Sequence, residues 1–364
     1  MTQPTHGGNV HKVARERRIS VEQIVDFSAN INPLGFPASG VRAIRSALQQ
    51  IVHYPDPACW KLRHALAQHC CVDPDMILVG NGSTELIHLL PRALAIESAL
   101  IIGPTFEEYA HALTDAGSVV QYVHATREER FRPPVQDVLK ELTAGRSRFD
   151  AVFLCNPNNP TGRVMNRRCV RELAEAVDRQ QAWLVVDEAF IDYCQTQSVV
   201  SMLNEYPRMV VLRSLTKFYA MPGLRIGYLL AASKVVGQIQ DRQPPWSVNS
   251  LVQEVSRSVL RDRTYAARSR TFMKQERSRF MRGLRSVPAM RAYPTAANFV
   301  LIELPGWACA GEVTDRLASE DLLVRDCSVL PGLTTQMIRV AIKTAKENRR
   351  LIAALGACLR KMQS

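Results

Sequence analysis

Residues 151–162 read AVFLCNPNNPTG, a short apolar run that ends directly in a polar turn, and this pattern decides the fold. Similar apolar runs, many of them rich in β-branched residues, recur along the first two thirds of the chain. They cover residues 76–79, 99–102, 119–123, 151–154, 183–186, 209–212 and 226–230. Because helix-like segments separate these seven runs, the sequence predicts a mostly parallel α/β sheet with helices on both faces.

The regions on either side of this pattern differ from it in composition. Residues 5–37 are rich in Gly, Asn and Pro, so we expect an extended N-terminal arm at 1–37, followed by an amphipathic helix at 41–50. The predicted large domain then covers 38–245. A long helix, strand-like runs at 298–304 and 337–342, and a closing helix predict a smaller α+β domain at 246–364.

Composition and charge restrict the class of protein. The 364 residues carry a net charge of +12, and residues 257–291 alone hold eleven Lys or Arg against two acids. Apolar residues at helical spacing predict one long helix there, with a basic outer face that is solvated or steers anionic substrates. No nucleic-acid motif accompanies it, so we expect no nucleic-acid partner.

The sequence also lacks the usual marks of export, membrane insertion and metal binding. It contains no apolar run of membrane-spanning length and no signal-peptide pattern at its start. The nine cysteines show neither metal-ligand nor disulfide spacing. We therefore expect a cytoplasmic protein without a bound metal.

Polar or aromatic clusters follow five of the seven predicted strands. The carboxyl ends of parallel strands meet at one edge of a sheet, where ligands bind in α/β proteins. The five clusters occupy residues 80–85, 103–106, 156–162, 187–190 and 214–217. Each alone could be a simple turn, but together they predict a ligand site at this edge.

The clusters contain the groups that would hold the phosphate of pyridoxal phosphate (PLP). A phosphate is bound well by backbone N–H groups at a helix start, by hydroxyls and by a cation. Gly82, Ser83 and Thr84 are predicted to open a helix, and Arg225 supplies the cation. Taken alone, residues 82–84 are typical of an ordinary helix cap.

The remaining clusters suit the cofactor ring. Asp187 can keep the ring nitrogen protonated, Asn159 can donate to the ring 3-oxygen, and Phe106 can stack on the ring. Lys217, the strand-end lysine, can form the Schiff base. Alone, Asp187 could hold a metal and Lys217 could be a surface lysine.

These motifs resemble the fold-type I PLP-dependent aminotransferases, specifically the histidinol-phosphate aminotransferase subgroup. The resemblance rests on 156–162, 187–189, 214–217 and 223–227, in order and spacing, and extends from His6 to about Arg350. It implies a seven-stranded large domain, cofactor contacts from Ser214 and Thr216, and a homodimer with shared active sites. Tyr54 would contact the cofactor phosphate of the neighbouring subunit.

Within that subgroup the sequence resembles more closely the threonine-phosphate decarboxylases of cobalamin biosynthesis than the aminotransferases. This similarity rests on residues 6–9 (HGGN), 26–35 (DFSANINPLG), 217–223 (KFYAMPG) and 245–249 (PWSVN), and on Phe190, where the aminotransferases usually have Tyr. It implies decarboxylation of L-threonine O-3-phosphate to (R)-1-aminopropan-2-ol O-phosphate, with Lys217 and Asp187 as catalytic residues. The implied contacts to this phosphorylated amino acid are His6, Gly7, Asn32, Asn159, Arg325 and Arg339.

Three other functions stay open at this point. A histidinol-phosphate aminotransferase would need the same cofactor and nearly the same site. A serine-phosphate decarboxylase would differ by one substrate methyl, which is worth only ~1–3 kcal/mol of discrimination. A non-catalytic PLP-fold protein is disfavoured because Lys217 and Asp187 are both present.

Overall fold

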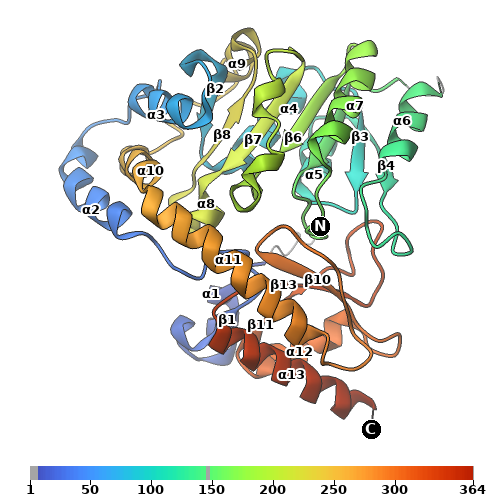
Figure 1. Cartoon of the computed structure of the whole chain (residues 1–364). Coiled ribbons are helices and arrows are strands. Elements are labelled where there is room, and N and C mark those ends of the chain that lie inside the picture. Colours follow the sequence, from blue (N-terminus) through green and yellow to red (C-terminus); the bar gives the residue numbers. More distant parts are fainter. Residues whose placement is uncertain (1–6, 145–147, 364) are drawn as a thin grey trace.

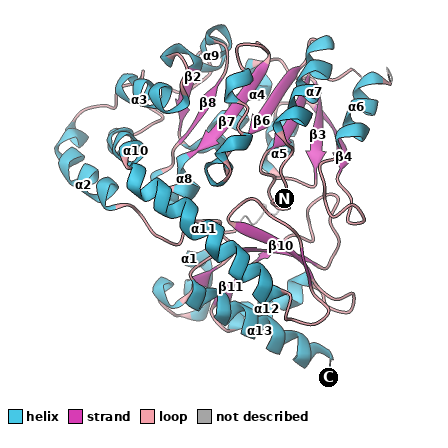
Figure 2. Cartoon of the chain, in the orientation of Figure 1, coloured by secondary structure: helices cyan, strands magenta, loops and turns pink. Residues whose placement is uncertain are grey.

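The computed structural model describes residues 7–144 and 148–363, which form an α/β part and a smaller α+β part (Figures 1 and 2). A seven-stranded sheet in the order β2-β8-β7-β6-β5-β3-β4 forms the larger part. β8 runs antiparallel to the other six strands, which are parallel to one another. The strands of this sheet are β2 (Ile77–Gly80), β3 (Ser98–Gly103), β4 (Val119–His124), β5 (Ala151–Cys155), β6 (Trp183–Asp187), β7 (Met209–Ser214) and β8 (Gly227–Leu230). The prediction of seven strands in a mostly parallel sheet is confirmed.

Helices cover both faces of this sheet because successive strand residues point to opposite sides. In β3, for example, Leu100 and Ile101 belong to different apolar clusters. One face packs against α4 (Gly82–Ala93), α5 (Glu108–Asp115) and α9 (Ser233–Gln240). The other packs against α3 (Trp60–Cys70), α6 (Val135–Thr143) and α7 (Arg167–Arg179). Burial on both faces explains the continuous apolar runs in the sequence.

The smaller part contains a four-stranded antiparallel sheet in the order β12-β13-β10-β9. Its elements are β9 (Arg291–Ala292), β10 (Phe299–Glu303), β12 (Arg325–Asp326), β13 (Met337–Ala341), α12 (Ala310–Ser319) and α13 (Ala345–Gln363). The strands predicted at 298–304 and 337–342 and the closing helix are thus confirmed.

The N-terminal segment is more structured than predicted. It forms α1 (Val10–Arg17) and β1 (Val25–Asp26), and β1 pairs in parallel with β11 (Leu322–Leu323). In Figure 1 these N-terminal elements lie beside the C-terminal ones. Ala14 and Ile24 pack against Leu323, and Arg17 pairs with Asp321 at 2.6 Å. The expectation of an extended conformation is wrong over α1, because this helix has an apolar contact to bury. The predicted boundaries after residues 37 and 245, which separate the arm, the large domain and the smaller domain, stay predictions.

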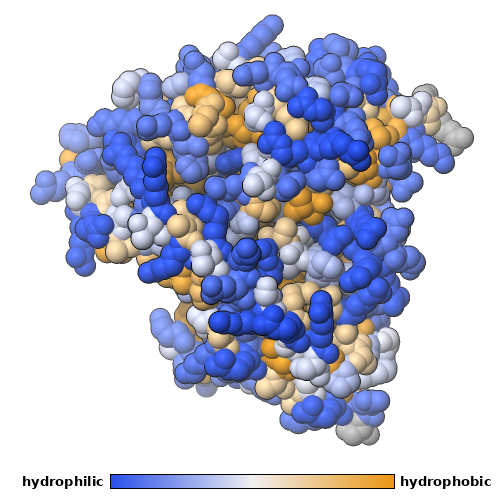
Figure 3. Space-filling view, in the orientation of Figure 1, coloured by the Kyte–Doolittle hydropathy of each residue, from blue (hydrophilic) through white to orange (hydrophobic). Residues whose placement is uncertain are grey.

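The basic segment forms two helices instead of the one long helix that we predicted. They are α10 (Ser250–Arg261) and α11 (Arg263–Leu284), which run diagonally in Figure 1, and Figure 3 shows hydrophilic side chains along their course. Asp262 ends the first helix with a non-helical ψ of 72° and caps the second by accepting from the Tyr265 N–H at 2.9 Å. The break arises because an Asp side chain favours the N-cap over a helix interior.

Two further elements complete the description. The predicted helix at 41–50 is α2 (Ala38–Ala47), continued by a 3-10 turn (Leu48–Val52). It packs against α10. Within the described residues, no helix is long and apolar enough to cross a membrane.

Candidate active site

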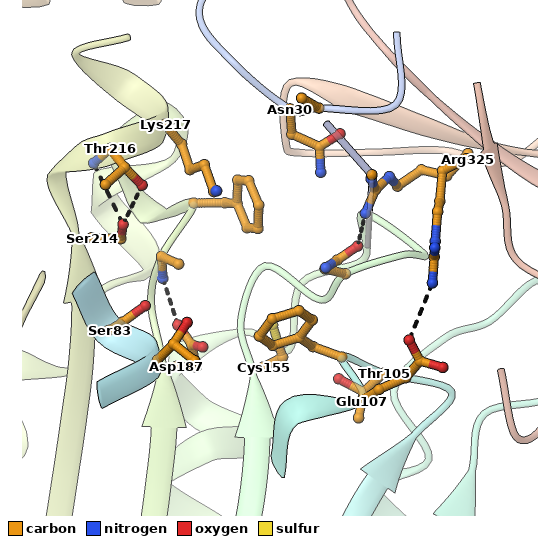
Figure 4. A pocket seen from close by; sticks show the side chains of 18 of the residues that line it. Asn30, Ser83, Thr105, Glu107, Cys155, Asp187, Ser214, Thr216, Lys217 and Arg325 are labelled. Carbon is orange, nitrogen blue, oxygen red and sulfur yellow. Dashed lines mark hydrogen bonds and ion pairs between the residues drawn. The ribbon is translucent and has the colours of Figure 1, made fainter. Parts of the chain in front are cut away.

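The polar clusters that follow the strands meet at one cavity of about 250 Å³ between the two sheets. Figure 4 shows side chains reaching it from the large sheet, the N-terminal segment and the smaller sheet. Thirteen of the predicted site residues line it: Gly7, Gly82, Ser83, Thr84, Phe106, Asn159, Asp187, Ser214, Thr216, Lys217, Arg225, Arg325 and Arg339. The predicted convergence of the strand ends is confirmed.

Lys217 lies in the short helix α8 (Leu215–Phe218), which follows β7 directly. Burial lowers the pKa of its amine to about 8, and the nearby Arg225 and Arg339 act in the same direction. Asp187 opposes them without restoring the ordinary value. Because only a neutral amine attacks a carbonyl, the site prepares Lys217 as a nucleophile near neutral pH.

Asp187 ends β6 and is only 4% exposed. Its carboxylate accepts the Tyr109 hydroxyl at 2.7 Å and the Ala189 N–H at 2.8 Å. Burial raises the pKa of Asp187, and these two hydrogen bonds oppose the rise. A desolvated carboxylate is stabilised by a cation, and a protonated pyridine nitrogen in the cavity would provide one. Tyr109 was missed in the sequence, although it follows Phe106 by three residues.

The start of α4 forms an anion site. Gly82 has a φ of +78°, and a Cβ there would lie 2.6 Å from Arg225 Nη2, so only glycine lets this arginine approach the helix start. Ser214 and Thr216, which line the same cavity, place their hydroxyls 2.7 Å apart. Backbone N–H groups, hydroxyls and a guanidinium therefore surround one corner, as a phosphate group requires.

The smaller sheet contributes two arginines that are direct partners across β12 and β13, Arg325 and Arg339. Arg339 donates to Asn159 Oδ1 and to the Ser28 carbonyl, which fixes the orientation of the Asn159 amide. Burial lowers the pKa of Arg339 to about 10. Arg325 instead pairs with Glu107, with Nη2 3.1 Å from Oε2. Figure 4 shows this ion pair across the cavity from Lys217.

Two of the predicted residues, Asn32 and Tyr54, are not brought into the cavity. The Asn32 side-chain nitrogen lies 2.8 Å from both the Phe218 carbonyl and the Ser269 hydroxyl, so this residue supports α8 and lies outside the cavity. Asn30, two positions earlier, lines it instead. Tyr54 is 79% exposed and stacks on Trp246, so its contact with a neighbouring subunit stays a prediction. His6 lies outside the described residues.

Several residues that the sequence analysis missed also line the cavity. They are Ser28, Ala29, Asn30, Thr105, Glu107, Tyr109, Cys155, Cys327 and Leu330. Asn30 is buried, and its Oδ1 has no hydrogen-bond partner in the part of the chain that the structure describes. An acceptor left unpaired at a cavity wall suits a polar ligand. Asn30 lies within the motif at residues 26–35, which is the sequence signal that could have identified it.

The residues present fit PLP. The anion corner suits the phosphate, Asp187 suits the ring nitrogen, and Phe106 and Asn159 line the same cavity. Lys217 and Asp187 both line this cavity, so the amine and the carboxylate can act on one bound group. The described residues hold no cluster of His, Cys, Asp and Glu suited to a metal ion.

Comparison with known proteins agrees with this geometry. The family model for class I and II aminotransferases matches residues 22–355. Threonine-phosphate decarboxylase of Salmonella typhimurium is 38% identical over 355 residues, 96% of this chain and 95% of that protein.

Two solved structures share the fold. L-threonine-O-3-phosphate decarboxylase from Porphyromonas gingivalis superposes with a TM-score of 0.81 at 26% identity, over 93% of this chain and 100% of that one. Histidinol-phosphate aminotransferase from Clostridium acetobutylicum gives 0.85 at 29% identity, over 92% and 99%. The chain therefore belongs to the class I and II aminotransferase family and is an enzyme that uses pyridoxal phosphate.

Proposed function

We propose that the chain decarboxylates L-threonine O-3-phosphate to (R)-1-aminopropan-2-ol O-phosphate and CO2, as a step of cobalamin biosynthesis. The observation that carries this proposal is the arginine pair opposite Lys217. Arg325 and Arg339 are partners on adjacent strands and both line the cavity. Two guanidinium groups suit a substrate with two anionic groups, a phosphate and a carboxylate. The 38% identity to a threonine-phosphate decarboxylase supports the same choice.

The arginines would determine which bond breaks. When bound, the cofactor withdraws electrons from the substrate Cα through its protonated ring. Arg325 and Arg339 would hold the substrate so that the bond from Cα to the carboxylate stands perpendicular to that ring. Binding energy from the unreactive phosphate would then be used for orientation at the reacting carbon.

Lys217 would donate the proton that the reaction requires. Loss of CO2 leaves an electron pair at Cα, and a proton must be added there to complete the product. The pKa of Lys217 is lowered to about 8, so its amine can both hold and release a proton near neutral pH. Asp187, held by the Tyr109 hydroxyl, would keep the ring nitrogen protonated meanwhile.

Phe190 supports a site that differs from that of an ordinary aminotransferase. Its ring meets the Phe299 ring edge-on at 4.9 Å, in a small apolar cluster with Ala189 and Ala297. A phenylalanine cannot donate to the ring 3-oxygen, so Asn159 would be the donor.

We also propose a homodimer that shares its active sites. Several large apolar side chains near Tyr54 are exposed in the single chain: Leu48, Ile51, Val52, Trp60 and Trp246. Exposed apolar groups of this number mark a surface that another molecule covers. A second copy there would bring Tyr54 to the neighbouring cofactor phosphate.

One experiment tests the reaction. Purified holoenzyme is mixed with L-threonine O-3-phosphate, and CO2 release is measured without any keto acid. We expect release, with L-serine O-phosphate tested in parallel. If no CO2 appears and histidinol phosphate is converted with 2-oxoglutarate instead, the proposal is wrong. The alternative function, suggested by the Clostridium acetobutylicum structure, would then replace it.

A further inference from the structure

A second and larger cavity, about 920 Å³, lies on the other side of the segment that carries Lys217. We call it the rear cavity. Its lining contains five arginines, which are Arg167, Arg213, Arg261, Arg263 and Arg270. His69 also lines it, and burial lowers the pKa of this side chain, which favours its neutral form. None of the described residues that line the cavity is acidic. The active-site cavity, in contrast, balances its cations with Asp187 and Glu107.

The two cavities share a wall because strand residues alternate between faces. In β7, Ser214 lines the active-site cavity and Arg213 lines the rear cavity. Tyr219, just after α8, also lines the rear cavity, while Lys217 lines the active site. Arg270 lies over the Phe218 ring at 5.7 Å. A ligand in the rear cavity would therefore contact the back of the Lys217 segment.

The arginines differ in how far the protein neutralises them. Arg213 is buried and pairs with Glu188 at 2.8 Å. Arg167 donates to the Ser201 hydroxyl at 2.7 Å and to the Ser198 carbonyl. Neither of these last two acceptors is charged.

The other three arginines, Arg261, Arg263 and Arg270, have no carboxylate within ion-pair distance in the part of the chain that the structure describes. Three carboxylates act on residues of the lining from outside it: Glu188 on Arg213, Asp192 on His69 and Asp262 on Tyr219. None of the three lines the cavity, so among the described residues four guanidinium groups share it without a facing carboxylate.

We propose that the rear cavity is a second binding site, for a small anion that carries two or more phosphate groups. Arginine forks match phosphate oxygens, and one phosphate cannot engage four guanidinium groups that come from three different helices. The hydroxyls of Ser198, Ser201 and Tyr219 in the lining add neutral hydrogen-bonding groups. The volume is in the range of small-molecule sites. This site also gives a role to part of the basic segment 257–291, which the proposed reaction does not use.

A small anion fits the cavity better than a nucleic acid does. A nucleic acid needs a stripe of charge along the surface, and it is read through a recognition motif. Here the charges converge on a hollow whose wall includes the buried Arg213. A compact polyphosphate can reach that depth, whereas a duplex cannot enter a hollow of this size.

Calorimetric titration of the holoenzyme with inorganic pyrophosphate tests the proposal. The informative variant is Arg261→Gln/Arg263→Gln, because both side chains are exposed and their loss should leave the fold intact. The matched control is Arg268→Gln/Arg282→Gln, which removes the same charge from exposed positions of α11 outside the cavity. Arg270→Gln provides a third, independent variant. Circular dichroism checks the fold of each protein.

We expect the Kd for pyrophosphate to rise at least about tenfold in Arg261→Gln/Arg263→Gln and less than about twofold in the control. The visible spectrum of the cofactor reports separately on pyrophosphate that enters the active site. Equal Kd values in the wild type and the first variant would overturn the proposal. So would an equal loss in the control, or binding of a nucleic acid in place of pyrophosphate.

Discussion

The two halves of the active-site cavity are built in different ways. The cofactor half comes from the carboxyl ends of neighbouring strands in one sheet, and it contains Lys217, Asp187 and the start of α4. The substrate half combines the N-terminal segment at Ser28 to Asn30, the start of α5, and Arg325 and Arg339 of the smaller sheet. The first half follows from the topology of a single sheet, whereas the second depends on how two parts of the chain pack together.

Replacing Lys217 tests the cofactor half and should have the largest effect. Lys217→Ala removes the amine that we propose attaches the cofactor and transfers the proton at Cα, so we expect turnover to fall about 10⁴-fold or more. CO2 release measures the loss, and circular dichroism should show an unchanged fold. Lys234→Ala, at an exposed position of α9, is the control. Full activity in Lys217→Ala would remove the basis of the cofactor assignment.

Replacing Arg325 tests the substrate half. Arg325→Gln would remove the charge-assisted contact that we propose to the substrate phosphate, and such a contact is worth about 1.5–3 kcal/mol. We therefore expect kcat/KM to fall about 10- to 100-fold while the visible absorbance of the bound cofactor stays the same. If Arg325→Gln lowers activity and leaves cofactor binding unchanged, the substrate half and the cofactor half act independently. Loss of the cofactor from Arg325→Gln would contradict that separation.

The pKa of Lys217 predicts a pH dependence within the cofactor half. The amine has a pKa lowered from 10.5 to about 8, so it is mostly protonated at pH 7 and mostly neutral at pH 9. Only the neutral form attacks, and we expect attachment of PLP to the apoenzyme to accelerate about tenfold between these pH values and then level off. Stopped-flow absorbance measures the rate. A rate that keeps rising toward pH 10 would show an unperturbed lysine.

The same contrast explains what could be predicted from the sequence. The strand pattern identified Asp187 and Lys217 because residues that follow buried parallel strands all lie at the carboxyl edge of the sheet. Tyr109 and Glu107 were missed because their roles depend on the direction in which the first turn of α5 points its side chains.

The substrate half was predicted only through resemblance, and less accurately. We predicted that Asn32 contacts the substrate, but Asn30 lines the cavity instead. The sequence alone does not show which of two nearby amides faces the cavity and which, like Asn32, forms hydrogen bonds inside the protein. The break between α10 and α11 was missed for a related reason. Apolar spacing continues through Asp262, while its side chain caps the second helix.

The smallest expected effect concerns Glu107, which holds Arg325 where the substrate half should bind phosphate. The two side chains are 15% and 12% exposed, so little water screens the ion pair and an incoming phosphate must displace this carboxylate. Glu107→Gln removes the carboxylate charge that competes with the phosphate for Arg325, and it keeps the size and shape of the side chain. We therefore expect KM for the phosphorylated substrate to fall about three- to tenfold.

Turnover should not rise with this tighter binding. The phosphate is unchanged by the reaction, so substrate and product gain affinity alike, and the product inhibition constant should fall by the same factor as KM. Glu108→Gln is the matched control, because it removes the same charge one residue along, where the side chain faces His88 and His111 outside the cavity. If KM rises in Glu107→Gln, Glu107 positions Arg325 for the substrate and does not compete with it.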